Sequence, residues 1–341
     1  MQQSFSVTPQ LLKDLRAAIS QLPPMNPWHG FWRFTTLGLM TISLAAVSWH
    51  SRSLLGFALG AIATSIVYAF WLICNHDATH RTLTGWTWFD LSMPRLVSWP
   101  MLWPVGVYNQ LHRLHHGWNG LDLRDPERVQ WTAAEYEAAP FWQRWYVRHQ
   151  WIIDIFVFGG IGLIVKTLLH GIELQSIYPQ LRKQLLIDVV GMFSIQGLII
   201  GLLYLQSISL WKYLLFWFVI ERSAGLIIQT RDHLEHYGMW QSTDSYQLTQ
   251  LYACRNLNEP AWVNWLMGGL PYHSVHHAFP NVASAQLPEA FHRLQAVLEH
   301  HLLPPMALEQ GYIATSVQLV NSASLIDTGD TPATTLTTQE C

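Results

Sequence analysis

Residues 53–80 read SLLGFALGAIATSIVYAFWLICNHDATH, an apolar run that ends in two histidines. The part 53–74 is long enough to cross a bilayer, which takes about 20 residues as a helix. His76 and His80 follow it four positions apart, and side chains at that spacing lie on one face of a helix. The stretch therefore predicts a membrane-spanning helix that delivers two imidazoles to one edge of the bilayer.

The composition of the whole chain also indicates a membrane protein. The 341 residues are 50% hydrophobic and only 12% charged, whereas a soluble domain is about 25% charged. The net charge is −3 and no basic stripe is present, which argues against a nucleic-acid partner. Cys74, Cys254 and Cys341 are too few and too far apart to predict a disulfide framework. The first 25 residues lack the apolar centre of a cleavable signal peptide.

Three more stretches are long and apolar enough to cross a bilayer. With the first they give two pairs, each joined by a short link: 31–49 with 53–74, and 185–205 with 208–229. Each pair reads as a helical hairpin. We therefore predict an all-α integral membrane fold with four transmembrane helices in two hairpins, and a helical cap on the cytoplasmic side that carries the histidine clusters.

Two further apolar stretches do not read as ordinary spans. Residues 86–107 contain three prolines, which break the helix, and broken backbone in lipid leaves polar groups unpaired. We interpret this stretch as interfacial or re-entrant, and 151–169, with one Asp and one Lys, as a short span or an interfacial amphipathic helix. The predicted organisation is a polar arm at 1–30, a membrane domain at 31–312 and a disordered tail at 313–341, which is rich in Thr, Ser and Asp.

Histidines gather in four groups along the chain. The groups are His76 and His80; His112, His115 and His116; His233 and His236; and His273, His276 and His277. Two groups have the spacing HxxHH, whose members share a helix face. Two such groups arise by chance in on the order of one chain in a thousand. Since imidazole is a good ligand for zinc, iron, copper and nickel, the groups predict a metal site.

The four groups can share one site only if they lie on one side of the membrane. With the four spans alone, His76 and His236 emerge on the same side, together with both termini. This requires that 86–107 and 151–169 make no net crossing. Most Arg and Lys residues fall on this side, whereas the other side has little beyond Arg52 and Lys212. Because positive residues mark the cytoplasmic side, we expect the site and both termini in the cytoplasm, or in the stroma of a plastid-type compartment.

The number of histidines predicts two ions. Zinc usually takes four ligands, so seven or more histidines exceed the needs of one ion. The chain lacks the Glu-x-x-His pair of a carboxylate-bridged di-iron bundle. An all-imidazole pair of ions that stays open to an outside ligand suits redox iron and dioxygen chemistry.

The segments HDATH, HRLHH and HSVHH resemble the three histidine boxes of the membrane fatty acid desaturase and hydroxylase superfamily, in order and in spacing. The resemblance extends over about residues 55–300, and NWLMGGLPYHSVHHAFPNV at 264–282 is especially similar to the third box of desaturases. It implies two Fe2+ ions, with O2 as co-substrate. The implied ligands are the box histidines, His76, His80, His112, His115, His116, His273, His276 and His277.

The superfamily resemblance also implies one ligand outside the boxes. This is His236, which stands at the end of an Asn-x-x-x-His pattern in the family. Here Asp232 replaces the Asn, so its role in bridging a water to the metal is open. His233 is a further candidate ligand.

Acidic residues beside the histidines are candidates to hold the ligands in place, because a metal-bound imidazole usually donates its second N–H to a carboxylate or carbonyl. Asp77, Asp122 and Glu235 are candidates for this role, and a helix cap or a loop salt bridge is the alternative for each. Asp125 is interpreted instead as the cap of a helix that begins at Pro126, within the RDPE sequence at 124–127.

The resemblance implies removal of hydrogen from an acyl-chain methylene pair to give a cis double bond. The first box has the spacing of acyl-lipid desaturases, and the third begins with His rather than the Gln of front-end desaturases. The chain contains no His-Pro-Gly-Gly haem motif, so a separate ferredoxin-like or cytochrome-like electron donor is expected.

Two other functions are compatible with clustered histidines. A hydroxylase or ketolase acting on a carotenoid, sterol or other lipid would carry the same boxes. A metal transporter without catalysis fits less well, because transporters place their ligands inside the spans, and the predicted spans lack histidine.

Overall fold

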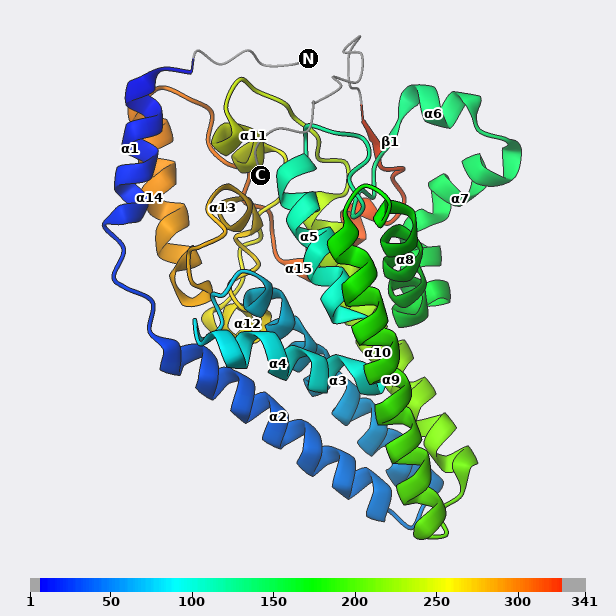
Figure 1. Ribbon diagram of the computed structural model, residues 1–341. Coiled ribbons are helices and arrows are strands. Elements are labelled where there is room, and N and C mark those ends of the chain that lie inside the picture. Colours follow the sequence, from blue (N-terminus) through cyan, green and yellow to red (C-terminus); the bar gives the residue numbers. More distant parts are fainter. Residues whose placement is uncertain (1–6, 327–341) are drawn as a thin grey trace.

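The computed structural model describes residues 7–326, which are mostly helical (Figure 1). The α-helices are α1 Pro9–Ser20, α2 Pro27–His50, α3 Leu54–Thr79, α4 Thr87–Ser98, α5 Val105–Trp118, α6 Ala133–Ala138, α7 Phe141–Ile152, α8 Gly159–Leu174, α9 Pro179–Leu205, α10 Leu210–His236, α11 Tyr246–Tyr252, α12 Ala261–Met267, α13 His273–Ala278, α14 Leu287–His300 and α15 Tyr312–Leu319. Among these residues, the strands are one parallel pair, β1 Trp131–Thr132 and β2 Leu325–Ile326. The prediction of an all-α fold is confirmed.

Two long hairpins form the body of the molecule, α2 with α3 and α9 with α10, and both turns lie at the same end (Figure 1). The side chains of Asn26 and Ser53 accept backbone N–H groups in the first turns of α2 and α3, which fixes where these helices begin. The Lys212 Nζ donates to the Trp49 carbonyl at 2.8 Å and holds the two tips together. At the opposite end gather α1, α5, α11, α13 and α14, which we call the cap.

Four helical stretches are long and apolar enough to cross a membrane, namely Pro27–His50, Leu54–Thr79, Phe141–Leu174 and Pro179–Leu205. Three of them cover the predicted spans 31–49, 53–74 and 185–205. The fourth differs from the prediction, since Phe141–Leu174 takes the place of 208–229. The physical reason is charge: α10 carries Lys212, Glu221 and Arg222 within its apolar part, which lowers its mean hydropathy.

The stretch Phe141–Leu174 is not one continuous helix. A π-helical segment, Ile153–Phe158, follows α7, and Gly159 then breaks the direction with φ 52° and ψ −140°. This break lies against the middle of α10, where the Arg222 side chain donates to the Val157 carbonyl at 2.6 Å and the Gln229 side chain donates to the Gly159 carbonyl at 3.0 Å. The arrangement is compatible with the prediction that 151–169 makes no net crossing, which stays a prediction.

The proline-rich stretch 86–107 is interrupted, as its sequence predicts. It forms α4, a 3₁₀ turn at Trp99–Met101 and the start of α5, with Pro100 inside the turn and Pro104 directly before α5. Its interfacial or re-entrant position stays a prediction.

The two ends of the described chain are more ordered than predicted. Within the predicted arm 1–30, Leu11 and Leu15 of α1 are buried in one apolar cluster with α14. The predicted disordered tail begins instead with α15 and β2, because β2 pairs with β1 at the register Trp131 to Leu325. The rest of that predicted tail, 327–341, lies outside the described residues.

We expect Gly225→Ala to destabilise the packing of α8 on α10. A Cβ at Gly225 would lie 2.0 Å from the Gly160 backbone nitrogen, and the backbone there has no room to retreat without separating the helices. Overpacking of this kind costs about 1–3 kcal/mol, so thermal unfolding in detergent should occur several degrees lower. A matched control is Gly201→Ala on α9, where an added methyl meets no atom within 4 Å. If the two variants melt alike, the close approach of α8 to α10 is wrong.

Candidate metal centre

Helix ends carry all nine of the predicted ligands into the interior of the cap. His76 lies in the last turn of α3 with His80 directly after the helix, and His236 is the last residue of α10. The two HxxHH groups lie on the C-terminal half of α5 and on α13. Eight of the nine side chains are buried, and His80 is half-buried.

The nine histidines divide into two adjoining groups. Five of them, the five-histidine pocket, are His76, His80, His112, His116 and His276. The other four, the four-histidine pocket, are His115, His236, His273 and His277. Within each group one nitrogen from every ring lies within 4.8 Å of the others. The groups meet where the rings of His116 and His277 stack, with centroids 4.0 Å apart.

The helical period explains this division. In each HxxHH group, the histidines at i and i+4 enter one pocket and the histidine at i+3 enters the other. With 3.6 residues per turn, position i+4 is rotated by about 40° from i, and position i+3 by about 60° in the opposite sense. One short helix therefore serves two pockets.

The spacing of the ring nitrogens fits metal ligation. The Nε2 atoms of His115 and His236 lie 3.1 Å apart, as do those of His116 and His276. Two ligands about 2.1 Å from one ion lie about 3.0–3.6 Å apart at angles of 90–120°. The Nε2 atoms of His76, His80 and His277 are buried without a hydrogen-bond partner. Buried polar atoms are rarely left unpaired, so these nitrogens are suited to hold an ion.

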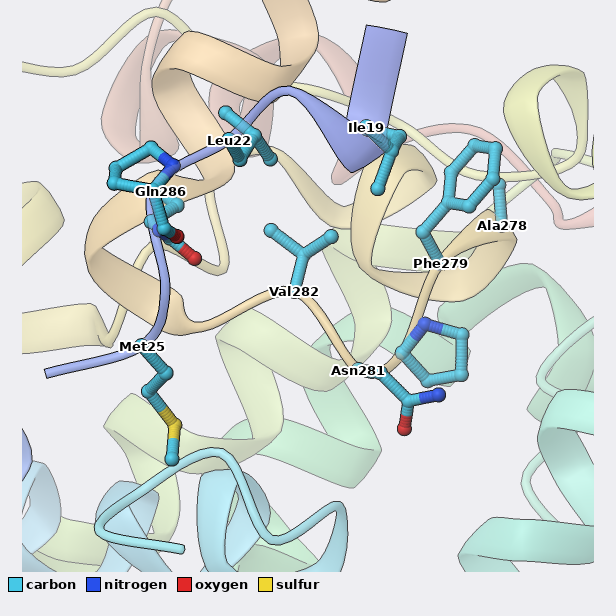
Figure 2. A pocket seen from close by; sticks show the side chains of 10 residues that line it. Ile19, Leu22, Met25, Ala278, Phe279, Asn281, Val282 and Gln286 are labelled. Carbon is cyan, nitrogen blue, oxygen red and sulfur yellow. The ribbon is translucent and has the colours of Figure 1, made fainter. Parts of the chain in front are cut away.

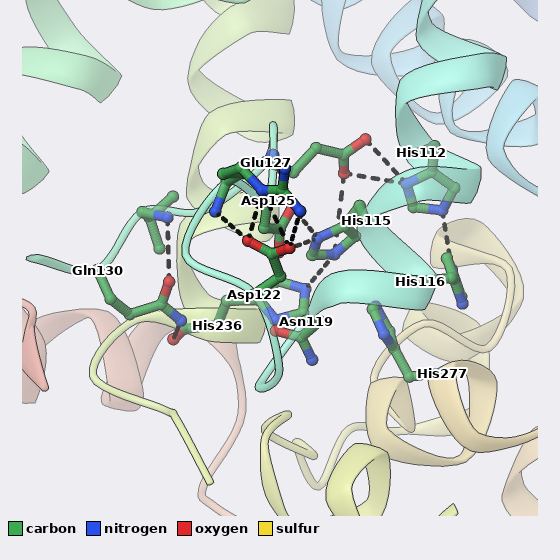
Figure 3. Close-up of polar contacts among 12 residues, drawn as sticks. His112, His115, His116, Asn119, Asp122, Asp125, Glu127, Gln130, His236 and His277 are labelled. Carbon is green, nitrogen blue, oxygen red and sulfur yellow. Dashed lines mark hydrogen bonds and ion pairs between the residues drawn. The ribbon is translucent and has the colours of Figure 1, made fainter. Parts of the chain in front are cut away.

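Carboxylates hold the other nitrogen of several rings (Figure 3). The Nδ1 atom of His115 lies 2.8 Å from an Asp125 oxygen, and that of His112 lies 2.9 Å from a Glu127 oxygen. Such contacts fix the orientation of a ligand and the position of its proton. Asp77, as predicted, approaches His76 Nδ1 at 3.4 Å.

The interpretation of RDPE as a helix start is wrong, because no helix begins at Pro126 and the segment forms a turn. Asp125 therefore does not cap a helix, and its carboxylate contacts His115 Nδ1 instead. Glu127, which contacts His112, was not among the predicted site residues. The signal that could have identified both residues is an acidic loop directly after the second box.

Three other predicted site residues stand apart from the nine ligands. Asp122 is paired with Arg124 at 2.6 Å, which is the loop salt bridge that the sequence left open as its alternative role. His233 Nε2 lies 2.8 Å from an Asp154 oxygen and belongs to neither pocket. Asp232 also belongs to neither pocket, and its oxygen lies 3.6 Å from the Arg231 guanidinium.

Burial sets the charge of the ligands. It holds the pKa of His112, His116, His273, His276 and His277 well below the usual value, and the neighbouring imidazoles act in the same direction. Burial also opposes the charged form of His115, but Asp125 and Glu127 outweigh it and raise its pKa to about 9. In the metal-free protein at pH 7, His115 is therefore the protonated ligand among these six.

We expect metal binding to the four-histidine pocket to release about one proton at pH 7. A ligating nitrogen must be deprotonated, and the pKa of His115 at about 9 lies above this pH. The affinity for Co2+, followed by visible absorption, should therefore rise about tenfold per unit from pH 7 to 9 and then level off. Asp125→Asn should weaken this slope, because it removes the largest of the contributions that raise the pKa of His115 and leaves Glu127 to act against burial. A wild-type affinity that is independent of pH would contradict the assignment.

Two hollows in the described structure lie outside the ligand pockets. One, between the link after α1 and the segment after α13, is lined by Ile19, Leu22, Phe279 and Val282 among others (Figure 2). No His, Cys, Asp or Glu lines it, so it offers no metal ligand. The other is an apolar cavity between α3, α8 and α10, lined in part by Leu72, Leu163 and Ile228.

Comparison with known proteins gives one family. A family model described as fatty acid desaturase matches residues 49–308. The chain is similar to the Delta 8-(E)-sphingolipid desaturase of Kluyveromyces lactis, at 29% identity over 76 residues, which are 21% of this chain and 13% of that protein. The Delta 8-(E)-sphingolipid desaturase of Komagataella phaffii is 32% identical over 76 residues, 21% of this chain and 14% of that protein. The matched stretch thus spans only a small part of the length of these relatives.

Proposed function

Because the chain belongs to the fatty acid desaturase family, we propose that it is an acyl-lipid desaturase that converts a methylene pair of an acyl chain into a cis double bond. The observation that carries this proposal is the division of nine histidines into two adjoining pockets, each built from several helices. A structural histidine cluster has no need for two sets of converging ring nitrogens, three of which, on His76, His80 and His277, are buried without a hydrogen-bond partner.

The residues of both pockets fit iron. Every donor is an imidazole nitrogen, a ligand that suits iron. With O2 and two electrons, the bound iron pair supplies an oxidant able to remove hydrogen from an unactivated methylene. The overall change is R–CH2–CH2–R′ + O2 + 2 e⁻ + 2 H⁺ → R–CH=CH–R′ + 2 H2O. The protein supplies ligand orientation, through Asp125 and Glu127, and a site shielded from water.

The apolar cavity supports a lipid chain as substrate. Its lining residues Trp103, Leu163 and Ile228 also line a second cavity, which reaches Tyr108 and Glu127. The Tyr108 ring stacks on His112 with centroids 5.2 Å apart. An acyl chain that occupies these two cavities would therefore place methylenes beside the five-histidine pocket.

The proposed orientation places the cap and the iron pair in the cytoplasm, or in a plastid stroma, with α2, α3, α9 and the apolar part of α10 crossing the bilayer. The hairpin tips carry Arg52 and Lys212 as their basic residues, whereas the cap side is rich in arginine. This difference in positive charge supports the proposed orientation. A cysteine introduced at Ser207 should react with an impermeant thiol reagent from outside intact cells. A separate ferredoxin-like or cytochrome-like protein is proposed to deliver the electrons from the cap side.

The experiment that tests the function is expression in a host with simple saturated and monounsaturated lipids that supplies both types of donor. Mass spectrometry of its fatty acids, and of sphingolipid long-chain bases because of the named relatives, should show a product two hydrogens lighter. A product heavier by one oxygen would indicate a hydroxylase instead. Unchanged lipids with an iron-loaded protein would contradict the proposal.

A further inference from the structure

We infer that Glu235 supplies an oxygen ligand to the ion of the four-histidine pocket, an inference that rests on the proposed function. This assigns to Glu235 direct contact with the metal, rather than the orientation of a histidine.

The position of the Glu235 carboxylate carries the inference. Its Oε2 atom lies 3.5 Å from His273 Nε2, the same nitrogen that lies 2.9 Å from His236 Nε2 inside the pocket. This separation is within the range of about 3.0–3.6 Å for two atoms that share one ion. Glu235 is not in the group whose atoms all lie within 4.8 Å of one another, so its carboxylate would move toward the ion on binding. The side chain is 3% exposed, and its Oε1 atom is buried without a hydrogen-bond partner. A buried carboxylate with one oxygen, Oε1, left unpaired is costly, and an ion that meets the other oxygen, Oε2, in this pocket would compensate its charge.

The ordinary explanation for the buried carboxylate is an ion pair with Arg231, but this pair leaves Glu235 Oε1 without a partner. Arg231 Nη1 lies 3.4 Å from Glu235 Oε2, and Arg231 Nη1 and Nε have no hydrogen-bond partners of their own. The guanidinium therefore balances the charge of Glu235 without binding both of its oxygens. An acidic group beside the four histidines of this pocket and the Arg231 guanidinium remains available to a metal.

The other carboxylates beside this pocket are less suitable. Asp125 already contacts His115 Nδ1 with both of its oxygens. Glu127 approaches His115 Nε2 only at 4.0 Å, and both of its oxygens already contact His112 Nδ1. Asp232, at the position that the family resemblance favoured, shares Arg231 with Glu235, but among the described residues only Glu235 of the two contacts a ligand nitrogen. The geometry thus favours Glu235 over the predicted Asp232.

This assignment makes the two ions unequal. Five histidines would hold one ion, and four histidines with one carboxylate would hold the other. The anionic ligand would stabilise the more oxidised state of its own ion, because it adds negative charge to one pocket only.

The test compares Glu235→Gln with the matched control Asp232→Asn, which removes a neighbouring carboxylate on the same helix. Both proteins, and the wild type, are loaded with ⁵⁷Fe2+ and studied by iron analysis and Mössbauer spectroscopy. For the wild type and for Asp232→Asn we expect about two ions per chain and two ferrous signals of equal intensity. In Glu235→Gln one signal should shift or disappear while the other stays unchanged. If that variant does not accumulate, Glu235→Asp should shift the same signal.

The outcomes separate this inference from the proposed function. A wild type that binds no iron would overturn both. Two ions in the wild type, with unchanged signals in Glu235→Gln, would overturn the Glu235 assignment alone. Loss of one ion in Asp232→Asn but not in Glu235→Gln would overturn it in favour of Asp232.

Discussion

His276→Ala should leave the protein with about one iron ion per chain and abolish product formation. His276 contributes the nitrogen of α13 to the five-histidine pocket, where its Nε2 lies 3.1 Å from that of His116. Replacing a residue that only supports a ligand costs about 10- to 100-fold in affinity or activity, so loss of a ligand should exceed 100-fold. Iron analysis of the purified protein and fatty-acid profiling of the expressing host measure the two effects.

Substitution of the next histidine on α13 tests whether each loss of metal is specific to one pocket. His277→Ala should remove the ion of the four-histidine pocket and leave the other, because His277 belongs to that pocket. His292→Ala on α14 is the control, since this histidine is exposed and outside both pockets. Two irons and full activity in His276→Ala would show that His276 is not a ligand.

Arg33→Met should cause the largest loss of stability among the substitutions considered. Arg33 of α2 and Asp77 of α3 form an ion pair at 2.7 Å, with side chains 1% and 4% exposed. The Arg33 guanidinium also donates to the Leu266 carbonyl at 3.0 Å, so one side chain joins the first hairpin to α12. Removing one partner of a buried pair leaves an uncompensated charge and costs about 3–5 kcal/mol. Thermal unfolding in detergent measures this loss.

Two controls distinguish the buried pair from a general effect of removing arginine. Arg124→Met breaks the pair with Asp122, in which the arginine side chain is 61% exposed, and should cost less than about 1 kcal/mol. Arg33→Met combined with Asp77→Asn should recover part of the loss, because no unpaired charge remains. If Arg33→Met unfolds at the same temperature as Arg124→Met, the buried pair does not stabilise the fold.

The eight box histidines followed from the sequence because their signal is local, whereas the ninth, His236, was implied by the family resemblance. Spacings of three and four residues place imidazoles on one helix face whatever the rest of the fold does. Three of the four spans were predicted for a similar reason, since length and hydropathy belong to each segment separately. The fourth shows the limit of this reasoning: α10 is less apolar than Phe141–Leu174, yet it is α10 that carries His236 to the metal centre.

The partners of these side chains depended on tertiary structure. A carboxylate in a loop has no periodicity to identify it, so the path of residues 119–130 decided that Asp125 meets His115 while Asp122 meets Arg124. The packing of the π-helical segment Ile153–Phe158 against α10 in turn directed His233 to Asp154. The sequence by itself determined which histidines share one face of a helix, because helical geometry acts over a few positions. Only the tertiary structure decided which of them meet, because contacts across tens to hundreds of residues depend on how the helices pack.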